Sequence, residues 1–159
     1  MKKILTLCMV ENGTQILLGM KKRGFGEGLW NGFGGKVEDS ESIIEAAKRE
    51  LTEEVGLHAE KLNLLGVLTF TFESDPKELE VHVFRVTTFS GEPVETDEMR
   101  PAWFLHQEIP LNSMWASDGY WLPALLRGES FKGQFHFDAP ATLDHKASIL
   151  SYTFELTNR

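Results

Sequence analysis

Apolar residues at the start of the chain form two short runs that are separated by a turn signal. The runs are Ile4 to Val10 and Gln15 to Met20, and the segment between them is Glu11-Asn12-Gly13-Thr14. Asn-Gly is a strong hairpin signal because both residues tolerate the positive φ angles of a tight turn. The chain is therefore predicted to open with a β-hairpin rather than a signal peptide, since no small-residue cleavage site follows the first run.

After a glycine-rich segment, the apolar residues from Ile43 to Val55 recur with the period of an α-helix. Ser42 and Glu45 have the spacing of a capping box, and Gly56 is suited to end the helix. With about 3.6 residues per turn, several apolar residues fall on one face. This predicted face, which we expect to pack on a sheet, consists of Ile44, Ala47, Leu51 and Val55.

The second half of the chain contains further strand-like runs. Two β-rich runs, Leu65 to Phe72 and Leu79 to Thr87, are separated by the turn-forming segment 73–77. Shorter strands are predicted at 102–104 and 135–137, a surface loop at 138–146 and a final strand at 149–156.

A second helix is predicted from Trp121 to Leu126. Ser117 or Asp118 could cap it, and Pro123 is tolerated only in a first helical turn, where its missing N–H is not needed. Together these elements predict an α+β or layered α/β fold. We expect a mixed β-sheet with two helices against it, in a single domain that covers residues 1–159.

The composition of the 159-residue chain fits one globular domain, with 42% hydrophobic and 25% charged residues. Its formal net charge of −8 disfavours a nucleic acid polymer or an anionic membrane as partner, because like charges repel. A small anionic ligand remains compatible with this charge, because a divalent cation can bridge carboxylates and phosphates.

Cys8 is the only cysteine, so no intrachain disulfide can form, and the five histidines lack the paired spacing of zinc ligands. No apolar stretch approaches the roughly 20 residues of a membrane span. These observations fit a reducing compartment, and we expect the protein in the cytoplasm.

Three glutamates of the first predicted helix, Glu50, Glu53 and Glu54, lie at positions i, i+3 and i+4. Their carboxylates are expected on one side of the helix, beside its apolar face. The ordinary explanation for such a group is a solvated charged face. The functional explanation is a site for a hard cation such as Mg²⁺, which prefers oxygen ligands. The glycine-rich segment 21–36 favours the second explanation, because glycine lets backbone approach a ligand closely.

The spacing around these glutamates resembles the Nudix box. It consists of Gly35, five residues, Glu41, seven residues, Arg49-Glu50-Leu51, one residue, Glu53-Glu54, one residue and Gly56-Leu57. So many defined positions at fixed spacing make a chance match improbable. Further segments resemble the MutT-homologue branch, the oxidised-purine nucleoside triphosphatases; they are 19–26, 30–37, 97–101, 114–115 and 120–121.

The resemblance implies a Nudix fold and an enzyme that depends on Mg²⁺, for which Mn²⁺ can substitute. It implies hydrolysis of oxidised or otherwise modified purine nucleoside triphosphates, of the 8-oxo-dGTP and 2-hydroxy-dATP type, to a monophosphate and pyrophosphate. Such an enzyme sanitises the nucleotide pool, and we expect it to act as a monomer on a small-molecule substrate.

The resemblance also implies roles for particular residues. Glu50, Glu53 and Glu54 become metal ligands, joined by the backbone carbonyl of Gly34, and Glu98 matches an additional acid that binds a metal or orients the attacking water. All four glutamates count as catalytic. Arg49 and Glu41 are expected to support the glutamates rather than to take part in the reaction.

A base pocket is implied by further matches. An aromatic plane can stack on a purine, while an amide and a carboxyl can read its polar edge; alone, each aromatic residue would be read as part of the core. Lys21 matches a residue near the sugar and phosphates. The substrate-binding residues expected on this basis are Thr6, Lys21, Phe25, Asn31, Phe33, Gly34, Gly35, Lys36, Trp115, Ser117 and Asp118.

One position departs from the family pattern. The family usually has two adjacent aspartates after the tryptophan, whereas this chain has Ser117 followed by Asp118. Ser117 can be read equally as a helix cap or as a ligand contact. The loop 138–146 is also longer than in the relatives that the resemblance suggests.

Two other functions remain in view. The first is a Nudix hydrolase for another nucleoside diphosphate derivative, such as a sugar nucleotide or a methylated nucleotide; Asn31 and Trp115 argue against the sugar nucleotide. The second is a nucleotide-binding module without catalysis. The retained set of mutually repelling glutamates argues against a silent module.

Overall fold

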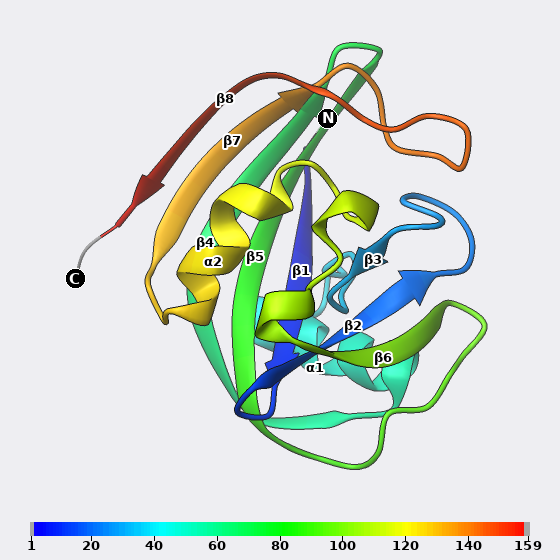
Figure 1. The fold of residues 1–159 in the computed structure, drawn as a ribbon, viewed down its shortest axis with the longest axis vertical. Helices are drawn as coiled ribbons and strands as arrows, with labels where there is room; N and C mark the ends of the chain where they lie inside the picture. Colours follow the sequence, from blue (N-terminus) through cyan, green and yellow to red (C-terminus); the bar gives the residue numbers. More distant parts are fainter. Residues whose placement is uncertain (1, 158–159) are drawn as a thin grey trace.

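The computed structural model describes residues 2–157, and within them one mixed β-sheet forms the centre of the molecule (Figure 1). The strand order is β3-β2-β1-β5-β4-β7-β8, with β6 paired to β2. The pairs β1·β5 and β4·β7 are parallel and the other pairs are antiparallel. The strands are β1 (Lys2–Glu11), β2 (Gln15–Lys21), β3 (Trp30–Asn31), β4 (His58–Phe72), β5 (Asp75–Ser90), β6 (Met99–Leu105), β7 (Phe131–Phe137) and β8 (Ile149–Leu156).

Two α-helices cover opposite faces of this sheet: α1 (Ile43–Val55) lies behind it and α2 (Asp118–Leu126) in front in Figure 1. Short 3₁₀ helices occupy His106–Glu108 and Leu111–Ser113. Alternating residues of β1 divide the apolar interior, because successive strand side chains point to opposite faces. Cys8 and Val10 pack with α1, whereas Met9 packs with α2. The predicted α+β architecture is therefore confirmed.

The predicted opening hairpin is confirmed, but its strands soon diverge. Only Val10 with Leu17 and Glu11 with Ile16 are paired between β1 and β2. Beyond them β2 pairs with β3 in place of β1, while β6 pairs with the other edge of β2 along its whole length. The glycine-rich segment fills the resulting gap, where residues 33 and 36 bridge to β1. This divergence places the segment at the centre of the sheet.

Helix α1 has the predicted bounds and caps, but one residue of its apolar face was assigned wrongly. Ile44 is 49% exposed, and it is Ile43 that packs against the core with Ala47 and Leu51. Ile43, Ala47 and Leu51 are each four residues apart, so their side chains lie along one side of the helix. The stripe therefore follows the spacing i, i+4, i+8.

Helix α2 begins three residues earlier than predicted, at Asp118. Pro123 lies in the second turn, so the prediction that it occupies the first turn is wrong. Its missing N–H means that the carbonyl of Gly119 receives no helical hydrogen bond from residue 123. Ser117 occupies the N-cap position but its side chain makes no capping hydrogen bond. The capping function predicted for Ser117 is therefore not used.

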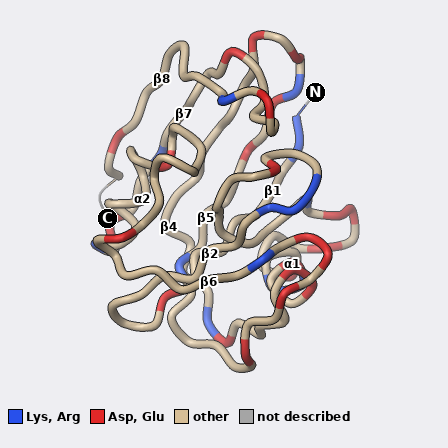
Figure 2. Tube along the Cα trace, turned by 45° about the vertical axis from the view of Figure 1, so that its right-hand side comes forward, with Lys and Arg blue, Asp and Glu red and all other residues tan. Residues whose placement is uncertain are grey.

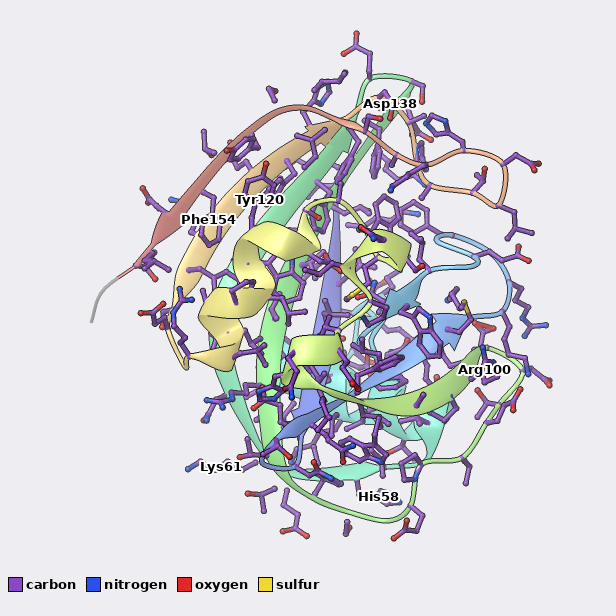
Figure 3. The ribbon with its side chains drawn as sticks, viewed as in Figure 1. His58, Lys61, Arg100, Tyr120, Asp138 and Phe154 are labelled. Atoms are coloured by element: carbon purple, nitrogen blue, oxygen red, sulfur yellow. The ribbon has the colours of Figure 1, made fainter. Side chains whose placement is uncertain are left out.

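The predicted later strands all form, and most are longer than their apolar runs. β4 and β5 extend to a tight turn at 73–74, so the predicted spacer 73–77 is partly strand. β3 was not predicted because it has two residues inside a glycine-rich segment. Residues 138–146 form a loop, as expected. At the β8 edge, Tyr120 of α2 packs on Tyr152 at 4.5 Å between ring centroids (Figure 3).

Charge is distributed unevenly over this fold. Figure 2 shows acidic residues gathered along α1 and the loop that precedes it. In residues 2–157, no helix has the length and apolar character needed to cross a membrane.

Candidate active site

Helix α1 is fixed at both ends by local hydrogen bonds. The Ser42 hydroxyl accepts a hydrogen bond from the N–H of Glu45 at 3.1 Å, and the Glu45 carboxylate accepts one from the N–H of Ser42 at 2.8 Å. At the other end Gly56 has a φ of 79° and its N–H donates to the carbonyl of Thr52. These caps hold the glutamate-bearing turn, which lies near the C-terminus of the helix, in a single register.

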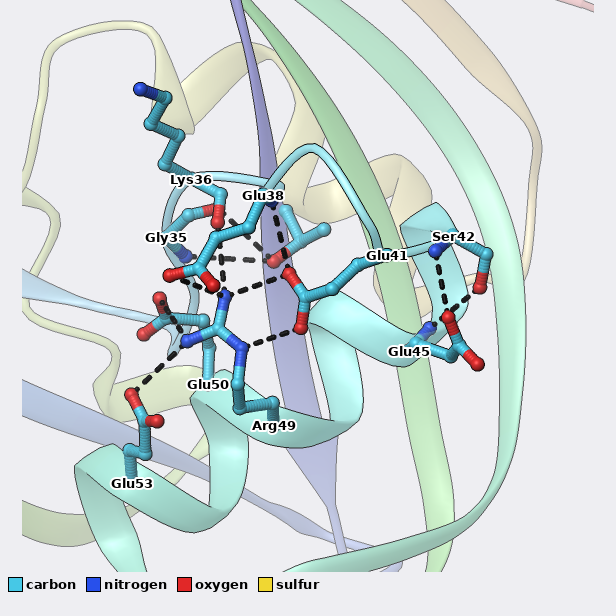
Figure 4. Close-up of polar contacts among 10 residues, drawn as sticks. Gly35, Lys36, Glu38, Glu41, Ser42, Glu45, Arg49, Glu50 and Glu53 are labelled. Atoms are coloured by element: carbon cyan, nitrogen blue, oxygen red, sulfur yellow. Dashed lines mark hydrogen bonds and ion pairs between the residues drawn. The ribbon is translucent and has the colours of Figure 1, made fainter.

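Arg49 organises the outer carboxylates of this helix (Figure 4). Its guanidinium donates to both oxygens of Glu41, at 2.5 and 2.9 Å, and to Glu50 at 3.1 Å and Glu53 at 3.2 Å. It also donates to the carbonyl of Lys36 at 3.1 Å. Hydrogen bonding to Glu41 raises the pKa of Arg49 and lowers that of Glu41. This arrangement agrees with the supporting role expected for Arg49 and Glu41.

Glu54 is the buried member of the acidic set, with 5% of its surface exposed. One carboxylate oxygen accepts a hydrogen bond from the Gly34 N–H at 3.0 Å. Burial raises the pKa of Glu54 to about 7, and the nearby charges of Glu50 and Glu98 add to this effect, while Lys21 and Gly34 oppose it. Burial also raises the pKa of Glu50. Two partly desolvated carboxylates thus repel each other, which is the environment that a cation relieves.

The segment Gly34–Gly35 passes between β1 and these glutamates with no room for a side chain. A Cβ atom on Gly34 would lie 1.8 Å from the Thr6 carbonyl oxygen, and one on Gly35 would lie 2.4 Å from a carboxylate oxygen of Glu50. Hydrogen bonds from the Thr6 N–H to the Gly35 carbonyl (2.9 Å) and from the Cys8 N–H to the Phe33 carbonyl (2.6 Å) tie the segment to β1. Glycine is therefore required here by close approach.

The donor set suits a hard divalent cation, because it consists of carboxylate oxygens and nearby backbone carbonyls. The four predicted metal-binding glutamates do not converge, however: in residues 2–157 no three Asp, Glu, His or Cys side chains form a cluster ready for a metal. Glu53 is 58% exposed and paired with Arg49. Glu98 accepts from the Arg23 Nε at 3.0 Å, and this contact lowers its pKa. Glu50 and Glu54 form the inner pair, while Glu53 and Glu98 lie to either side.

A cavity of about 250 Å³ adjoins this inner pair. Glu54 and Lys21 lie on its lining together with aromatic residues and Asp118. Nine of the expected site residues meet on this one surface. They are Thr6, Lys21, Phe25, Asn31, Gly34, Gly35, Glu54, Trp115 and Asp118.

The side chains around Asp118 form a polar cluster in apolar surroundings. The side chain of Asp118 is buried, and its Oδ2 atom has no hydrogen-bond partner among the described residues. The Trp121 Nε1 and Ser117 Oγ atoms are equally buried and lie beside the Asp118 carboxyl, where they oppose the rise in its pKa without forming a well-aligned hydrogen bond. Burial raises the pKa of Asp118 to about 7. Near neutral pH this carboxyl can therefore be a donor or an acceptor.

The remaining polar and aromatic contacts of the cavity are arranged around the glycine-rich segment. The Asn31 side-chain oxygen accepts the Gly32 N–H at 2.8 Å, which leaves its amide N–H groups available. Phe25 stacks on Trp115 with 5.1 Å between ring centroids. The cavity therefore combines stacking surfaces with polar groups that can recognise a flat heterocycle.

Three of the expected substrate-binding residues do not reach this lining. Phe33 is fully buried in the core on the α1 side of the sheet, next to Gly19. Lys36 lies on the loop that bonds to Arg49, and Ser117 lies behind Asp118 with none of its surface exposed. Eight apolar lining residues were missed by the sequence analysis, although strand alternation could have indicated those on β1, β4 and β5; they are Leu5, Leu7, Phe70, Phe72, Leu79, Val81, Met99 and Trp121.

Comparison with known proteins agrees with this geometry. The protein-family model described as the NUDIX domain matches residues 1–125 of this chain. An oxidized purine nucleoside triphosphate hydrolase of Danio rerio is 48% identical over 145 residues, which cover 91% of this chain and 93% of that protein. The protein of the same description from Mus musculus is 45% identical over 151 residues, covering 95% and 93% of the two chains.

Solved structures give the same result at the level of the fold. The crystal structure of a MutT protein from Bacillus halodurans superposes with a TM-score of 0.83 at 29% identity, covering 96% of this chain and 97% of that chain. A MutT NUDIX hydrolase from Burkholderia pseudomallei superposes with a TM-score of 0.66 at 29% identity, covering 69% of this chain and 88% of that chain. The capped acidic helix, the glycine segment and the sheet between two helices are thus those of a known enzyme family, and the chain belongs to the Nudix hydrolases.

Proposed function

We propose that this enzyme hydrolyses oxidised or otherwise modified purine nucleoside triphosphates to a nucleoside monophosphate and pyrophosphate, and so removes damaged precursors from the nucleotide pool. The observation that carries the proposal is the single cavity of about 250 Å³ that joins Glu54 and Lys21 to the aromatic pair and Asp118. The fish and mouse relatives, at 48% and 45% identity over almost their whole length, support this substrate class.

Nudix hydrolases use divalent metal ions, and we propose Mg²⁺ for this chain, with Mn²⁺ as a substitute. Glu50, Glu53, Glu54 and Glu98, with the Gly34 carbonyl, would hold it. A bound ion would neutralise phosphate charge and make a bound water more acidic. For Glu53 to join the set, it must leave Arg49, which now holds it at 3.2 Å. Glu54 already lines the cavity, and the Glu50 carboxylate lies next to Gly35, which also lines it, so these two glutamates would need the smallest change.

The chain's own groups would orient the substrate at both ends. Lys21, whose ammonium lies 3.5 Å from Glu98, would bind phosphate oxygens beside the acidic set. At the other end, Asp118 would exchange hydrogen bonds with the base edge and Asn31 would donate its amide N–H groups. A base bound there would supply a partner to the unpartnered Asp118 Oδ2, which removes the cost of leaving a buried polar atom unsatisfied.

The test is a nucleotide panel with Mg²⁺ in which pyrophosphate and the nucleoside monophosphate product are both assayed, because cleavage of a sugar nucleotide releases no pyrophosphate. It should contain 8-oxo-dGTP, 2-hydroxy-dATP, methylated purine nucleotides, undamaged dGTP and dATP, and a sugar nucleotide. We expect pyrophosphate release with the highest kcat/KM on modified purines. Equal kcat/KM for undamaged and modified purines would contradict the proposed selectivity, and preferential cleavage of the sugar nucleotide would assign the chain to another Nudix activity.

We further propose that the enzyme acts as a monomer in the cytoplasm, where free nucleotides are available. The single, buried Cys8 supports a reducing compartment. Sedimentation at micromolar concentration and microscopy of the tagged protein would test the two statements separately.

A further inference from the structure

Phe25 forms an exposed part of the cavity wall, and its position depends on neighbours from other segments. The ring is 44% exposed although it lines the cavity. It stacks on Trp115 at 5.1 Å with 29° between the planes, and the edge of Phe72 meets it at 6.1 Å and 88°. Phe72 belongs to the buried core and Trp115 packs against it, so these two aromatic residues connect the ring to the core.

The backbone that carries Phe25 is held by hydrogen bonds from the Glu27 N–H to the Gly24 carbonyl and from the Leu29 N–H to the Gly26 carbonyl, both at 3.1 Å, but these bonds do not fix the orientation of the ring. Gly24 and Gly26 on either side have φ angles of +82° and +81°, and a Cβ atom on Gly24 would meet nothing within 4 Å. Glycine adopts such angles freely and has no side chain that could pack against the ring. A ring placed between two such glycines must be oriented by contacts of its own.

Lys77 supplies a further contact from a distant part of the chain. It lies near the start of β5, where its N–H donates to the Asp75 carboxylate at 2.9 Å and fixes the hairpin end. Its ammonium nitrogen lies 5.0 Å from the centroid of the Phe25 ring. The ammonium therefore lies over the ring in addition to the stack that the ring makes with Trp115. A cation over an aromatic face at this distance is attracted by the ring quadrupole.

The position of Lys77 separates it from the phosphate end of the cavity. Lys21 and Glu54 mark that end, whereas Lys77 contacts the aromatic end through Phe25. The same strand β5 supplies Leu79 and Val81 to the cavity wall. One hairpin thus provides both a part of the cavity wall and the Lys77 ammonium that contacts the Phe25 ring.

We propose that Lys77 is a positioning residue that holds the Phe25 ring against Trp115 at the rim of the cavity, and that it thereby sets the affinity for the substrate's base. The effect on substrate rests on the proposed function; the contact itself does not. Because the wall is present in both the bound and the transition state, loss of the contact should raise KM and leave kcat unchanged.

The first experiment measures kcat and KM of Lys77→Met, which keeps the length of the side chain without its charge, on the best purine triphosphate of the panel. We expect KM to rise about threefold, as a contact of about 0.5–1 kcal/mol allows. Lys77→Arg should restore it, because a guanidinium also stacks on aromatic faces. A change confined to kcat, or no rescue by arginine, would overturn the proposal.

Two controls separate this role from general attraction of phosphate. Lys61→Met removes the same charge at the other end of β4, far from the cavity, and should leave KM unchanged (Figure 3). Inhibition by inorganic pyrophosphate, which has no base, should be equal in wild type and Lys77→Met. A weaker inhibition by pyrophosphate in the variant would show that Lys77 acts on phosphates, and would contradict the proposal.

A double-mutant cycle tests the coupling to Phe25. In a Phe25→Leu background the substitution Lys77→Met should have no further effect on KM, whereas additive effects would contradict the proposed contact. In the free protein, the ε-methylene protons of Lys77 should resonate upfield because of the Phe25 ring current, and Phe25→Leu should abolish this shift. This NMR measurement needs no substrate, so an unshifted resonance overturns the contact even where the proposed substrate class fails.

Discussion

Glu54 and Asp118 are two carboxyl groups on the lining of the same cavity whose pKa values burial raises to about 7. Their partners differ. Glu54 receives an N–H from Gly34 and lies beside Glu50, so its environment suits a cation. Asp118 has only the uncharged groups of Ser117 and Trp121 beside it, and its Oδ2 has no partner among the described residues. Burial thus raises the pKa of both residues, but their different neighbours suit Glu54 to metal binding and Asp118 to hydrogen bonding with a base.

Replacing Glu54 by glutamine should separate catalysis from folding. The glutamine carbonyl oxygen can still accept the Gly34 N–H, so the fold should persist, but the neutral amide cannot supply the ligand charge. We expect kcat to fall by about 10²–10⁴, the range typical of lost acid–base or metal function. Circular dichroism and steady-state kinetics measure the two effects. Activity near that of wild type in a folded Glu54→Gln variant would exclude Glu54 from the reaction.

Asp118 should give folding stability a measurable pH dependence. Because burial raises its pKa from 3.8 to about 7, the folded state holds the proton more tightly than the unfolded chain. Its contribution to stability is therefore complete below about pH 4 and is lost as pH rises to about 7. Asp118→Asn removes this dependence. Urea titrations should measure the free energy of unfolding of both proteins from pH 4 to 8. Over this range the wild-type value should fall, relative to that of the variant, by on the order of 4 kcal/mol at most. A difference between the two proteins that stays constant with pH would refute this prediction.

Ser117 stands where the resemblance described in the sequence analysis leads us to expect the first of two adjacent aspartates. A second carboxyl beside Asp118 would share a proton with it, because two buried like charges resist ionising together. Ser117→Asp should therefore shift the ratio of kcat/KM between 8-oxo-dGTP and 2-hydroxy-dATP, by about 1–3 kcal/mol if one buried polar contact changes. Profiles from pH 6 to 9 for both proteins are the measurement. Identical profiles would show that the residue does not influence base selection.

At the scale of elements, the divergence of β1 and β2 creates the site. The two strands share two residue pairs before β3 takes the place of β1 beside β2, while β6 stays paired to the other edge of β2. The glycine segment then takes the place beside β1 and carries Gly34 and Gly35 toward α1. The caps of α1 set which turn faces this segment. The candidate active site therefore lies where the pairing of β1 with β2 ends and the glycine-rich loop takes the place of β2 beside β1.

The two adjacent glycines should respond differently to alanine. At Gly34 the added Cβ would meet the Thr6 backbone at 1.8 Å, which cannot move, so Gly34→Ala should destabilise the fold by about 3 kcal/mol or more. At Gly35 it would meet the end of the Glu50 side chain at 2.4 Å, which can rotate away. Gly35→Ala should therefore stay folded while kcat falls about 10–100-fold. Thermal unfolding and kinetics test the pair, and equal losses of stability would contradict the distinction.

At the scale of the whole molecule, an acidic protein has to bind an acidic substrate. The formal net charge is −8, and acidic residues gather along α1 (Figure 2), which supplies Glu54 to the cavity. A divalent cation can reverse the local sign, whereas the charge elsewhere still repels a polyanion. Metal ions should therefore control activity on small substrates without conferring affinity for nucleic acid.

Chelation and substrate size test this balance. EDTA should abolish hydrolysis, Mg²⁺ or Mn²⁺ should restore it, and the same modified base within an oligonucleotide should remain unprocessed. Pyrophosphate release and mass spectrometry of the oligonucleotide are the measurements. Hydrolysis that persists in EDTA would contradict the metal requirement, and removal of the base from the oligonucleotide would contradict the restriction to free nucleotides.

Features that depend only on residues close together in the sequence were determined by the sequence alone. Hydrogen bonds within a few residues define α1, and the spacing i, i+3, i+4 of Glu50, Glu53 and Glu54 needs only a helix. The turn at Asn12-Gly13 likewise requires only the conformational freedom of those two residues. The motif around α1 could therefore be predicted before any tertiary contact was known.

Only the tertiary structure decided on which face of the sheet each side chain lies and which residues it contacts. Sequence could not tell that Phe33 faces α1 while Phe25 lines the cavity, or that Ile43 rather than Ile44 enters the core. The burial of Asp118 and the pairing of Glu98 with Arg23 depend on segments far apart along the chain. Such properties arise from long-range packing, which sets solvent exposure and local charge, and no short stretch of sequence contains that information.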